Sequence, residues 1–447
     1  AHDESLATTP VHPMAAVFPS CTAQVASIVA LAARAGVPVT ARGSGSGLSG
    51  GCVPTPGGIV VCLSRMRAVL ELDADNQAAI VEPGVTLDEL DAVLAPHGLV
   101  YPVRPGEQSA SIGGTVATNA GGMRAVRYGV TRNNVLGLEL VLGTGEVVRS
   151  GGRYVKCSSG YDLTQIVIGS EGTLALVTEA TLKLQPALAC QATVLAPFAG
   201  LGDVSRAIPQ ILQSGLLPSV LEYIDGLTMQ VISASAPLGL AISEDLRAAA
   251  AAYLLVVIEH RVETRVDEDL ELLSEVLGRA GALEMFVLPR ADAESLVAAR
   301  ERAFYGAKAA GADDIVDVVV PRANMAAFLE EVAELASGHG AFAAGCGHVG
   351  DGNVHLAVFQ PDPLARGAFL EDVFRAGIDL GGAMSGEHGI GGAKRDSFNR
   401  LQAPEHLALM RRLKAAFDPA GILNPDKVLA PERDRPGGLD ATTRAGM

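Results

Sequence analysis

The stretch Arg42-Gly-Ser-Gly-Ser-Gly-Leu-Ser-Gly-Gly51 lies between two β runs, at 37–41 and 57–63. Its glycines can adopt positive φ and turn successive N–H groups toward an anion such as a pyrophosphate. A Rossmann motif would need a helix directly after the glycines, whereas a strand follows here. The stretch therefore predicts an anion-binding loop without a Rossmann nicotinamide site; a flexible surface loop is the alternative.

Two further glycine-rich blocks follow, at 105–129 and 160–186. Three such blocks next to predicted strands favour a shared binding role over three unrelated surface loops. A helix is expected at 21–36, with Ser20 as its cap and Gly36 as its stop. The segment at 135–152 is expected to form a hairpin that turns at Gly-Thr-Gly-Glu.

The pattern changes after Pro186, where charged amphipathic helices alternate with apolar strands. A single helix is predicted at 291–311, and the run at 314–321 reads as a strand. A final helix is expected to end at Pro419 and Gly421. This part of the chain therefore predicts a second domain of the α+β class.

Composition excludes several classes of protein. The chain has 447 residues, is 49% hydrophobic, contains 51 glycines and carries a formal charge of −16. Such a charge repels nucleic acid, and we expect no nucleic-acid partner. No uncharged apolar run reaches the ~18 residues of a membrane-spanning helix. The six scattered cysteines and the absence of a signal sequence favour a cytoplasmic protein with reduced thiols.

Two histidines flank a glycine-rich turn in Gly345-Cys-Gly-His348-Val-Gly-Asp-Gly-Asn-Val-His355. A hairpin centred between Asp351 and Gly352 would place His348 opposite His355, with Cβ atoms about 5 Å apart. This spacing suits two ligands of one metal ion. A purely structural pair of histidines is the alternative.

The loop Ser385-Gly-Glu387-His388-Gly-Ile-Gly-Gly392 carries a charged dipeptide between glycines. Glu387 would complete a site of two histidines and one carboxylate, and His388 could act as a general base. A solvated loop is the alternative. Arg300 and Lys394 could each bind a substrate carboxylate, although solvated charges are the more common explanation for both.

These motifs resemble those of the vanillyl-alcohol oxidase/PCMH-type flavoproteins. Within that group, GHVGDGNVH, SGEHGIG and FDPAGILNPDKVL resemble the FAD-linked D-2-hydroxyacid dehydrogenases, which include D-lactate dehydrogenase, the glycolate oxidase flavin subunit and D-2-hydroxyglutarate dehydrogenase. The resemblance runs from about Pro19 to Leu429. Its members usually carry further residues before the equivalent of His2, so the chain looks shortened there.

The resemblance implies an α+β fold with three parts. Residues 1–187 would form the FAD-binding domain of two α/β subdomains. Residues 188–400 would form a ferredoxin-like cap with an antiparallel sheet and the metal site. Residues 401–447 would contain a C-terminal helix that returns to the flavin.

The resemblance also assigns cofactor positions. Covalent members have a histidine at Ser46, so the FAD here is expected to be noncovalent. The residues implied to bind FAD are Arg42, Gly43, Ser44, Gly45, Ser46, Gly47, Leu48, Gly113, Gly114, Thr118, Asn119, Gly122, Gly129, Glu171, Gly172, Val177 and Asn424.

A divalent metal, zinc or manganese, is implied at His348, His355 and Glu387. The catalytic base falls on His388, and the arginine that holds the substrate carboxylate falls on Arg300; we add His388 and Lys394 as substrate-binding candidates. The expected reaction moves a hydride from the substrate to flavin N5. A quinone, a cytochrome or an electron-transfer flavoprotein would then take the electrons.

Two residues differ from the family pattern and bear on the choice of substrate. Enzymes that act on 2-hydroxyglutarate use a lysine and an asparagine where this chain has Ile315 and Ala357. A small or apolar D-2-hydroxy monocarboxylate such as D-lactate is therefore favoured. The alternatives are a D-2-hydroxyglutarate dehydrogenase, a glycolate oxidase flavin subunit, an oxidase that uses O₂, and a noncatalytic flavin-carrying subunit. A metal-dependent hydrolase without flavin is a further alternative, which would leave the three glycine-rich blocks unexplained. A homodimer and a peripheral position at the inner membrane face are further expectations from the family.

Overall fold

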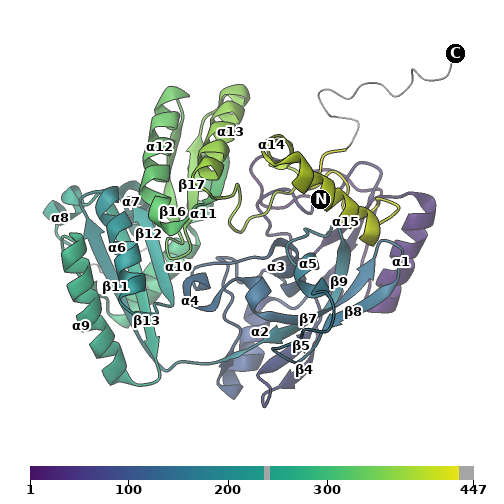
Figure 1. Ribbon diagram of the computed structural model, residues 1–447, viewed down its shortest axis with the longest axis horizontal. Helices are drawn as coiled ribbons and strands as arrows, with labels where there is room; N and C mark the ends of the chain where they lie inside the picture. Colours follow the sequence, from purple (N-terminus) through teal and green to yellow (C-terminus); the bar gives the residue numbers. More distant parts are fainter. Residues whose placement is uncertain (236–241, 432–447) are drawn as a thin grey trace.

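The computed structural model describes residues 1–235 and 242–431 and shows two parts side by side (Figure 1). One part is built from the first 186 residues and the C-terminal helices, and the other from the residues between them. Among these described residues, no helix is both long and apolar enough to cross a bilayer.

The first part contains two main sheets. A parallel sheet has the order β1-β3-β2 and an antiparallel one the order β4-β5-β9-β7-β8. Their strands are β1 (Ala15–Val17), β2 (Val39–Arg42), β3 (Ile59–Cys62), β4 (Val69–Asp73), β5 (Ala78–Val81), β7 (Val135–Leu142), β8 (Val147–Gly151) and β9 (Ala175–Lys183). The strands β6 (Leu99–Val100) and β10 (Gln185–Pro186) form a small pair. The helices are α1 (Thr22–Ala35), α2 (Leu87–Leu94), α3 (Ile112–Thr118), α4 (Ala125–Tyr128) and α5 (Leu163–Val167).

The predicted first helix forms as α1. Its buried residues Val25, Val29 and Ala32 follow one helical face, and Gly36 ends it in the left-handed conformation at φ 65°. Ser20 is not its cap, which corrects that expectation. The N-cap is Cys21, and both the amide and the hydroxyl of Ser20 instead donate to the Gln24 side chain. The predicted hairpin forms as β7 and β8.

The second part is one seven-stranded antiparallel sheet of order β14-β11-β13-β12-β16-β17-β15. Its strands are β11 (Cys190–Phe198), β12 (Val220–Asp225), β13 (Ala252–His260), β14 (Phe286–Val287), β15 (Asp314–Val319), β16 (Phe342–Gly347) and β17 (Asn353–Phe359). The helices are α6 (Leu201–Gln213), α7 (Gly226–Ser235), α8 (Glu244–Ala249), α9 (Glu263–Ala280), α10 (Arg290–Glu301), α11 (Ala303–Ala309), α12 (Met325–Gly338) and α13 (Pro363–Asp379). This mixture agrees with the predicted α+β class.

Successive side chains along each strand point to opposite faces of this sheet. Every second side chain, such as Val316, Val318 and Leu356, enters a core shared with α6, α9, α12 and α13. The intervening residues, Asp317 on β15 and His355 on β17, therefore point to the opposite face. Local two-residue periodicity is thus enough to put polar groups on the face directed away from that core.

Two sequence expectations in this part are wrong. The helix predicted at 291–311 is two helices, α10 and α11, separated at Arg302, where neither glycine nor proline marks a break. In the β16–β17 hairpin Cys346 is opposite His355, whereas His348 lies in the connecting loop. The strands stop pairing earlier than a two-residue turn requires, and amides of Asp351 and Asn353 both donate to the His348 carbonyl.

The C-terminal segment returns to the first part through α14 (Arg395–Leu401) and α15 (Pro404–Phe417), so that the yellow end lies beside the purple start in Figure 1. Leu423 bridges Val39 in parallel. The buried carboxylate of Asp418 accepts from the amides of Ile422 and Leu423 and from Lys414 Nζ at 2.5 Å. Residues 432–447 of the predicted C-terminal part lie outside the described residues.

Replacing Lys414 by Met tests this anchor. Lys414 Nζ also donates to the carbonyls of Thr173 and Leu423, so K414M leaves the Asp418 carboxylate buried without its cation. We expect the free energy of unfolding to fall by about 2 kcal/mol or more, measured by urea titration of the holoprotein. The matched variant Arg412→Met, on the exposed side of the same helix, should change it by less than about 0.5 kcal/mol. Equal effects of the two would contradict the role given to Lys414.

Candidate functional site

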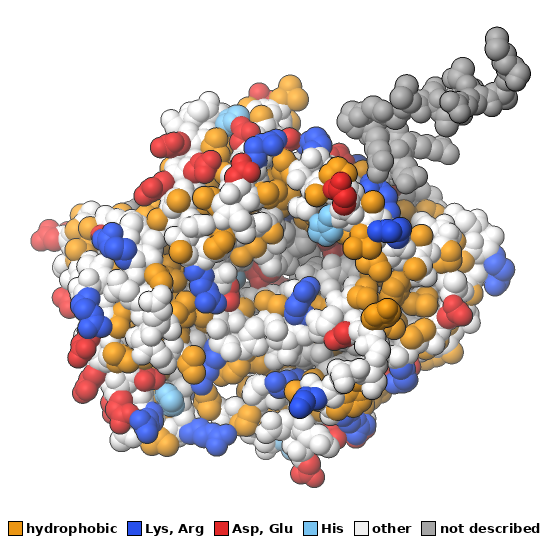
Figure 2. All heavy atoms as spheres, viewed as in Figure 1, with side chains coloured by type: hydrophobic (Ala, Val, Ile, Leu, Met, Phe, Trp, Pro, Cys, Tyr) orange, Lys and Arg blue, Asp and Glu red, His pale blue; other side chains and the backbone are white. Residues whose placement is uncertain are grey.

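Two cavities meet between the two parts of the molecule. The first, about 210 Å³, is lined by all three glycine-rich blocks. The second, about 310 Å³, lies against the face of the seven-stranded sheet that carries His355. Both are lined by Gly106, Glu387 and His388. Figure 2 shows this face of the molecule hollowed between the two parts, with charges of both signs scattered over it rather than gathered into a basic patch.

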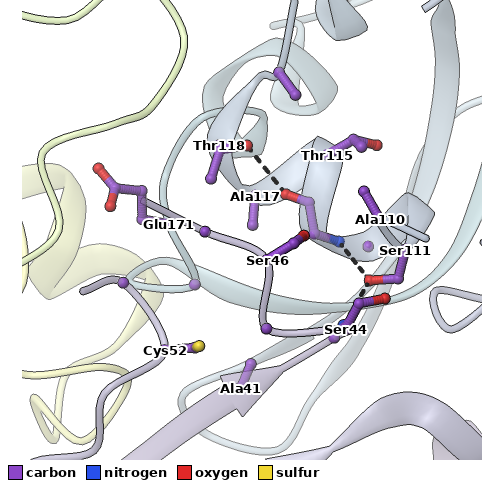
Figure 3. Close-up of a pocket in the computed structure, with 18 of the residues that line it drawn as sticks. Ala41, Ser44, Ser46, Cys52, Ala110, Ser111, Thr115, Ala117, Thr118 and Glu171 are labelled. Carbon is purple, nitrogen blue, oxygen red and sulfur yellow. Dashed lines mark hydrogen bonds between the residues drawn. The ribbon is translucent and has the colours of Figure 1, made fainter. Parts of the chain in front are cut away.

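The loop from Arg42 to Leu48 forms one wall of the first cavity. Among the described residues, the amides of Gly45, Ser46, Gly47 and Leu48 have no hydrogen-bond acceptor. Ser111 Oγ accepts from the amides of Ser44 and Gly114, which ties this loop to the first turn of α3 (Figure 3). Unpaired amides around a glycine-lined cavity fit the pyrophosphate of a dinucleotide.

Most of the predicted cofactor residues line this cavity. They are Arg42, Gly43, Ser44, Gly45, Ser46, Gly47, Leu48, Gly113, Gly114, Thr118, Glu171, Gly172 and Val177. Sequence reasoning did not single out Asp3, Cys52 or Ser111, which line it as well. A serine and a cysteine in loops give no sequence signal for this position.

Four predicted cofactor residues do not line the cavity and instead shape its walls: Asn119, Gly122, Gly129 and Asn424. Asn424 Nδ2 donates to the carbonyls of Gly51 and Glu171, each at 2.8 Å. Gly122 has φ 106°, and a Cβ there would lie 1.8 Å from the carbonyl oxygen of Arg104. These residues therefore hold the cavity-forming loops together.

The loop at 385–392 is held from both parts of the molecule. From the sheet, Asp317 Oδ2 accepts from the Ser385 hydroxyl at 2.5 Å and from the amides of Glu387 and His388 at 3.2 and 2.8 Å. From the first part, the Glu171 carboxylate accepts from the amides of Ile390 and Gly391, each at 2.8 Å. The loop therefore presents Glu387 and His388 where the two cavities meet.

The structure brings His348, His355 and Glu387 together. Glu387 Oε1 lies 3.3 Å from Nε2 of each histidine. The two imidazole rings are 4.8 Å apart between centroids and nearly perpendicular. The histidines thus meet as predicted, although their cross-strand register differs from the expected one.

These three residues fit a divalent metal. Ligand atoms about 2.1 Å from an ion at tetrahedral angles lie about 3.4 Å from one another, close to the observed separations. The two ring nitrogens of His355 are shielded from solvent, and neither has a well-aligned hydrogen-bond partner among the described residues. His348 Nδ1 lies 2.6 Å from Glu222 Oε1, which leaves Nε2 turned toward the site. Two imidazoles and a carboxylate suit zinc or manganese.

A second possible grouping, Asp317 with His355 and His388, is a poorer metal site. Asn353 Nδ2 already donates to Asp317 Oδ1 at 2.9 Å, and the loop occupies Oδ2. The oxygens of Asp317 are therefore engaged in positioning other groups.

Buried charges surround the histidines. The carboxylates of Glu222, Asp317 and Glu387 are linked by ion pairs to these rings and to two cations, Arg300 and Lys394. With neutral imidazoles this cluster carries three negative and two positive charges, a net charge of −1. A divalent cation and one substrate carboxylate together would bring the total to zero, which low-dielectric surroundings favour.

The pKa values reflect this charge pattern. Burial lowers the pKa of His348, but Glu222 and Glu387 outweigh it and raise that pKa to about 10. Burial lowers the pKa of His388 to about 4, so its imidazole is neutral near pH 7. Burial would raise the pKa of Glu387, yet His348 and His355 hold it well below its usual range. The carboxylates of Glu222 and Glu387 thus favour a cation beside them, and the neutral imidazole of His388 can accept a proton.

Arg300 and Lys394 occupy different positions. Arg300, at the end of α10, is buried against Glu222 Oε2 at 2.6 Å and lines the second cavity. Its Nε has no hydrogen-bond partner. Lys394 lines neither cavity and lies 3.9 Å from Asp317 Oδ2. Of these two cations, Arg300 is thus the one that lines the second cavity.

Sequence reasoning missed Glu222 and Asp317, both fully buried. Each carboxylate lies between apolar neighbours inside its strand, within Val220-Leu-Glu-Tyr-Ile and Ile315-Val-Asp-Val-Val. A buried charge is costly unless it is paired. A carboxylate that interrupts an apolar run was therefore the sequence feature that could have indicated a functional residue.

Comparisons with known proteins agree with this arrangement. Residues 13–151 match the model of the FAD binding domain, and residues 189–428 match that of the C-terminal domain of FAD linked oxidases. A solved 4-ethylphenol oxidase from Gulosibacter chungangensis superposes with a TM-score of 0.76 at 19% identity, covering 97% of this chain and 92% of that one. This likeness shows a PCMH-type FAD-binding fold.

Two curated relatives align along nearly the whole chain. An uncharacterised FAD-linked oxidoreductase of Mycobacterium tuberculosis is 52% identical, with 96% of this chain and 93% of the relative covered. A D-lactate dehydrogenase of Archaeoglobus fulgidus is 36% identical, with coverages of 92% and 90%. Two of the three glycine-rich blocks that line the first cavity lie within the matched FAD binding domain, and the chain belongs to the family of FAD-linked oxidoreductases.

Proposed function

We propose that this oxidoreductase oxidises a D-2-hydroxy monocarboxylate to the 2-oxo acid in a reaction that depends on FAD and a divalent metal. The observation that carries the proposal is the shared wall of the two cavities, where Glu387 and His388 line both. A substrate in the second cavity would thus approach both the flavin and the metal ligands. The D configuration rests on the relative named D-lactate dehydrogenase.

Arg300 would bind the substrate carboxylate. Arg300 lines the second cavity, and its Nη2 is paired with Glu222 Oε2 at 2.6 Å. An unpartnered Nε in a buried guanidinium can donate to a carboxylate. Glu222 would thus orient both the substrate-binding arginine and a metal-binding histidine, since its other oxygen contacts His348.

His388 would act as the general base. Its Nδ1 lies 3.8 Å from Asp317 Oδ2, and its Nε2 lies 3.9 Å from Glu387 Oε1, beside the proposed metal ligands. Nε2 would take the proton of the substrate hydroxyl. Asp317 is a positioning residue here, since it fixes the His388 backbone and faces its ring.

Bound FAD would accept the hydride from the carbon that bears the hydroxyl, and a bound divalent cation would acidify that hydroxyl group. The substrate thus loses a hydride and a proton and becomes the 2-oxo acid. We also propose that FAD is held noncovalently, because a serine at position 46 lines its cavity.

A dicarboxylate substrate is disfavoured. Ile315 and Ala357 are cross-strand partners and both line the second cavity. Neither can pair with a second carboxylate, which would be buried at a cost. The intact cluster of histidines and carboxylates supports a catalytic chain over a noncatalytic flavin carrier.

Anaerobic mixing with 2-hydroxy acids tests the proposal. A D-2-hydroxy monocarboxylate should bleach the visible absorption of the oxidised flavin, and prior removal of metal by a chelator should slow bleaching by at least ~10²-fold. The L enantiomer and untreated enzyme serve as controls. A yellow, metal-loaded protein that no 2-hydroxy acid reduces would show that the proposed substrate class is wrong.

His355→Ala tests the metal ligands without reference to turnover. Loss of one of three protein ligands should reduce bound zinc or manganese to background, measured by elemental analysis after gel filtration, while the FAD content stays at the wild-type ratio. His406→Ala, an exposed histidine on α15, is the control. Full metal content in H355A would exclude His355 as a metal ligand.

His388→Ala tests the base. We expect the rate of flavin reduction to fall by 10²- to 10⁴-fold, the range of general-base loss, with FAD and metal contents unchanged. Stopped-flow absorbance under anaerobic conditions measures the rate directly. Reduction at the wild-type rate in this variant would exclude His388 as the base.

A further inference from the structure

The second cavity extends well beyond the groups assigned to the reacting end of the substrate. Along β17, His355, Ala357 and Phe359 point into it from successive positions on one face. From the first to the last of these residues the strand advances four residues, about 13 Å. Only the His355 end carries the metal ligands and the base.

The floor of this extension is a row of small and apolar side chains across three strands. Ala357 pairs with Ile315 on one side and with Ala344 on the other. One step further along the sheet, Phe359 pairs with Phe342, and their rings lie 5.8 Å apart. The two alanines leave space above the sheet, and the two phenylalanines bound that space at its far end.

The roof is apolar as well. It comes from α7, α11 and the residue that follows α11, and its apolar members are Leu227, Val231, Ala303, Phe304, Ala307 and Ala310. Among the described residues, the ionisable carboxylate and basic groups that line the cavity are Arg300, Glu301, Glu387 and the three histidines of the reacting end. The extension therefore offers contacts to hydrocarbon and no partner for a second charge.

From this geometry we infer that the preferred substrate is a 2-hydroxy acid with an extended apolar side chain, linear or aromatic, rather than one with the methyl group of lactate. The inference rests on the proposed function and specifies its substrate class. The carboxylate would remain at Arg300, and the tail would run over Ala357 toward Phe359. A methyl substituent would leave most of the apolar extension without a partner.

Burial of the apolar tail would favour substrates with longer side chains over shorter ones. Each methylene moved from water into an apolar cavity favours binding by about fourfold. Because a tail contact is formed before hydride transfer and kept during it, the gain should appear in kcat/KM. Lengthening the side chain by four methylenes would thus raise kcat/KM by about 10²-fold.

A chain-length series on the holoenzyme tests the inference. The D forms of lactate, 2-hydroxybutanoate, 2-hydroxyhexanoate, 2-hydroxyoctanoate and 3-phenyllactate would be compared in anaerobic flavin reduction, with D-2-hydroxyglutarate as the charged control. The rate constant at low substrate concentration should rise with apolar length and be lowest for the dicarboxylate.

The outcomes separate this inference from the proposed function. If lactate reduces the flavin as efficiently as the longer acids, the extended tail is wrong and the proposed reaction stands. If 2-hydroxyglutarate does so, both the apolar tail and the preference for a monocarboxylate are wrong, and only the oxidation of a 2-hydroxy acid stands. If no acid in the series reduces the flavin, the proposed reaction fails and the inference falls with it.

Two matched variants of α11 locate the tail. Ala307→Leu would place a larger side chain in the roof, whereas Ala309→Leu makes the same change at an exposed position of that helix outside the cavity. We expect A307L to lower the ratio of kcat/KM for 2-hydroxyoctanoate to that for lactate by at least tenfold, and A309L to leave this ratio within twofold.

Calorimetric titration of the 2-oxo acid products gives a readout independent of turnover. 2-Oxooctanoate should bind more tightly than pyruvate by at least tenfold in the wild type and A309L, and this advantage should shrink in A307L. Equal affinities for the two products in the wild type, or an unchanged advantage in a folded A307L, would overturn the placement of the tail.

Discussion

The arrangement of the site depends on two buried carboxylates that hold one loop. Asp317 receives the Ser385 hydroxyl and the amides of Glu387 and His388 from the side of the sheet. Glu171 accepts hydrogen bonds from the amides of Ile390 and Gly391 from the side of the first part. Because a carboxylate that accepts amide hydrogen bonds fixes their direction, the loop joins the two parts and places its side chains at their common wall.

The buried charges form a balanced set rather than a collection of separate ion pairs. Glu222 touches both Arg300 and His348, so one carboxylate connects the proposed substrate site with the proposed metal site. Asp317 likewise faces His355, His388 and Lys394. Each buried charge would be costly alone. Together they leave room for one dication and one carboxylate, which are the charges that the proposed reaction requires.

The sequence predicted the components of the fold well where a local pattern carries them. Gly36 ends its helix, the hairpin at β7 and β8 forms, and strand β15 lies where its apolar run predicts. Errors arose where the sequence carries no local signal. The break at Arg302 has no breaker residue, and the register of the β16–β17 hairpin depends on a loop longer than its glycines suggest.

The sequence by itself determined the α+β class, and it predicted the glycine-rich loops of the first cavity and the grouping of His348, His355, Glu387 and His388, because motifs and periodicity are local properties. The tertiary structure decided which residues support them. Glu222 and Asp317 stand on strands that are far apart in the chain, and only sheet pairing turns their side chains to the same face. The tertiary structure also decided the shape of the second cavity, because the floor and roof of this cavity come from five separate elements and the residue after α11.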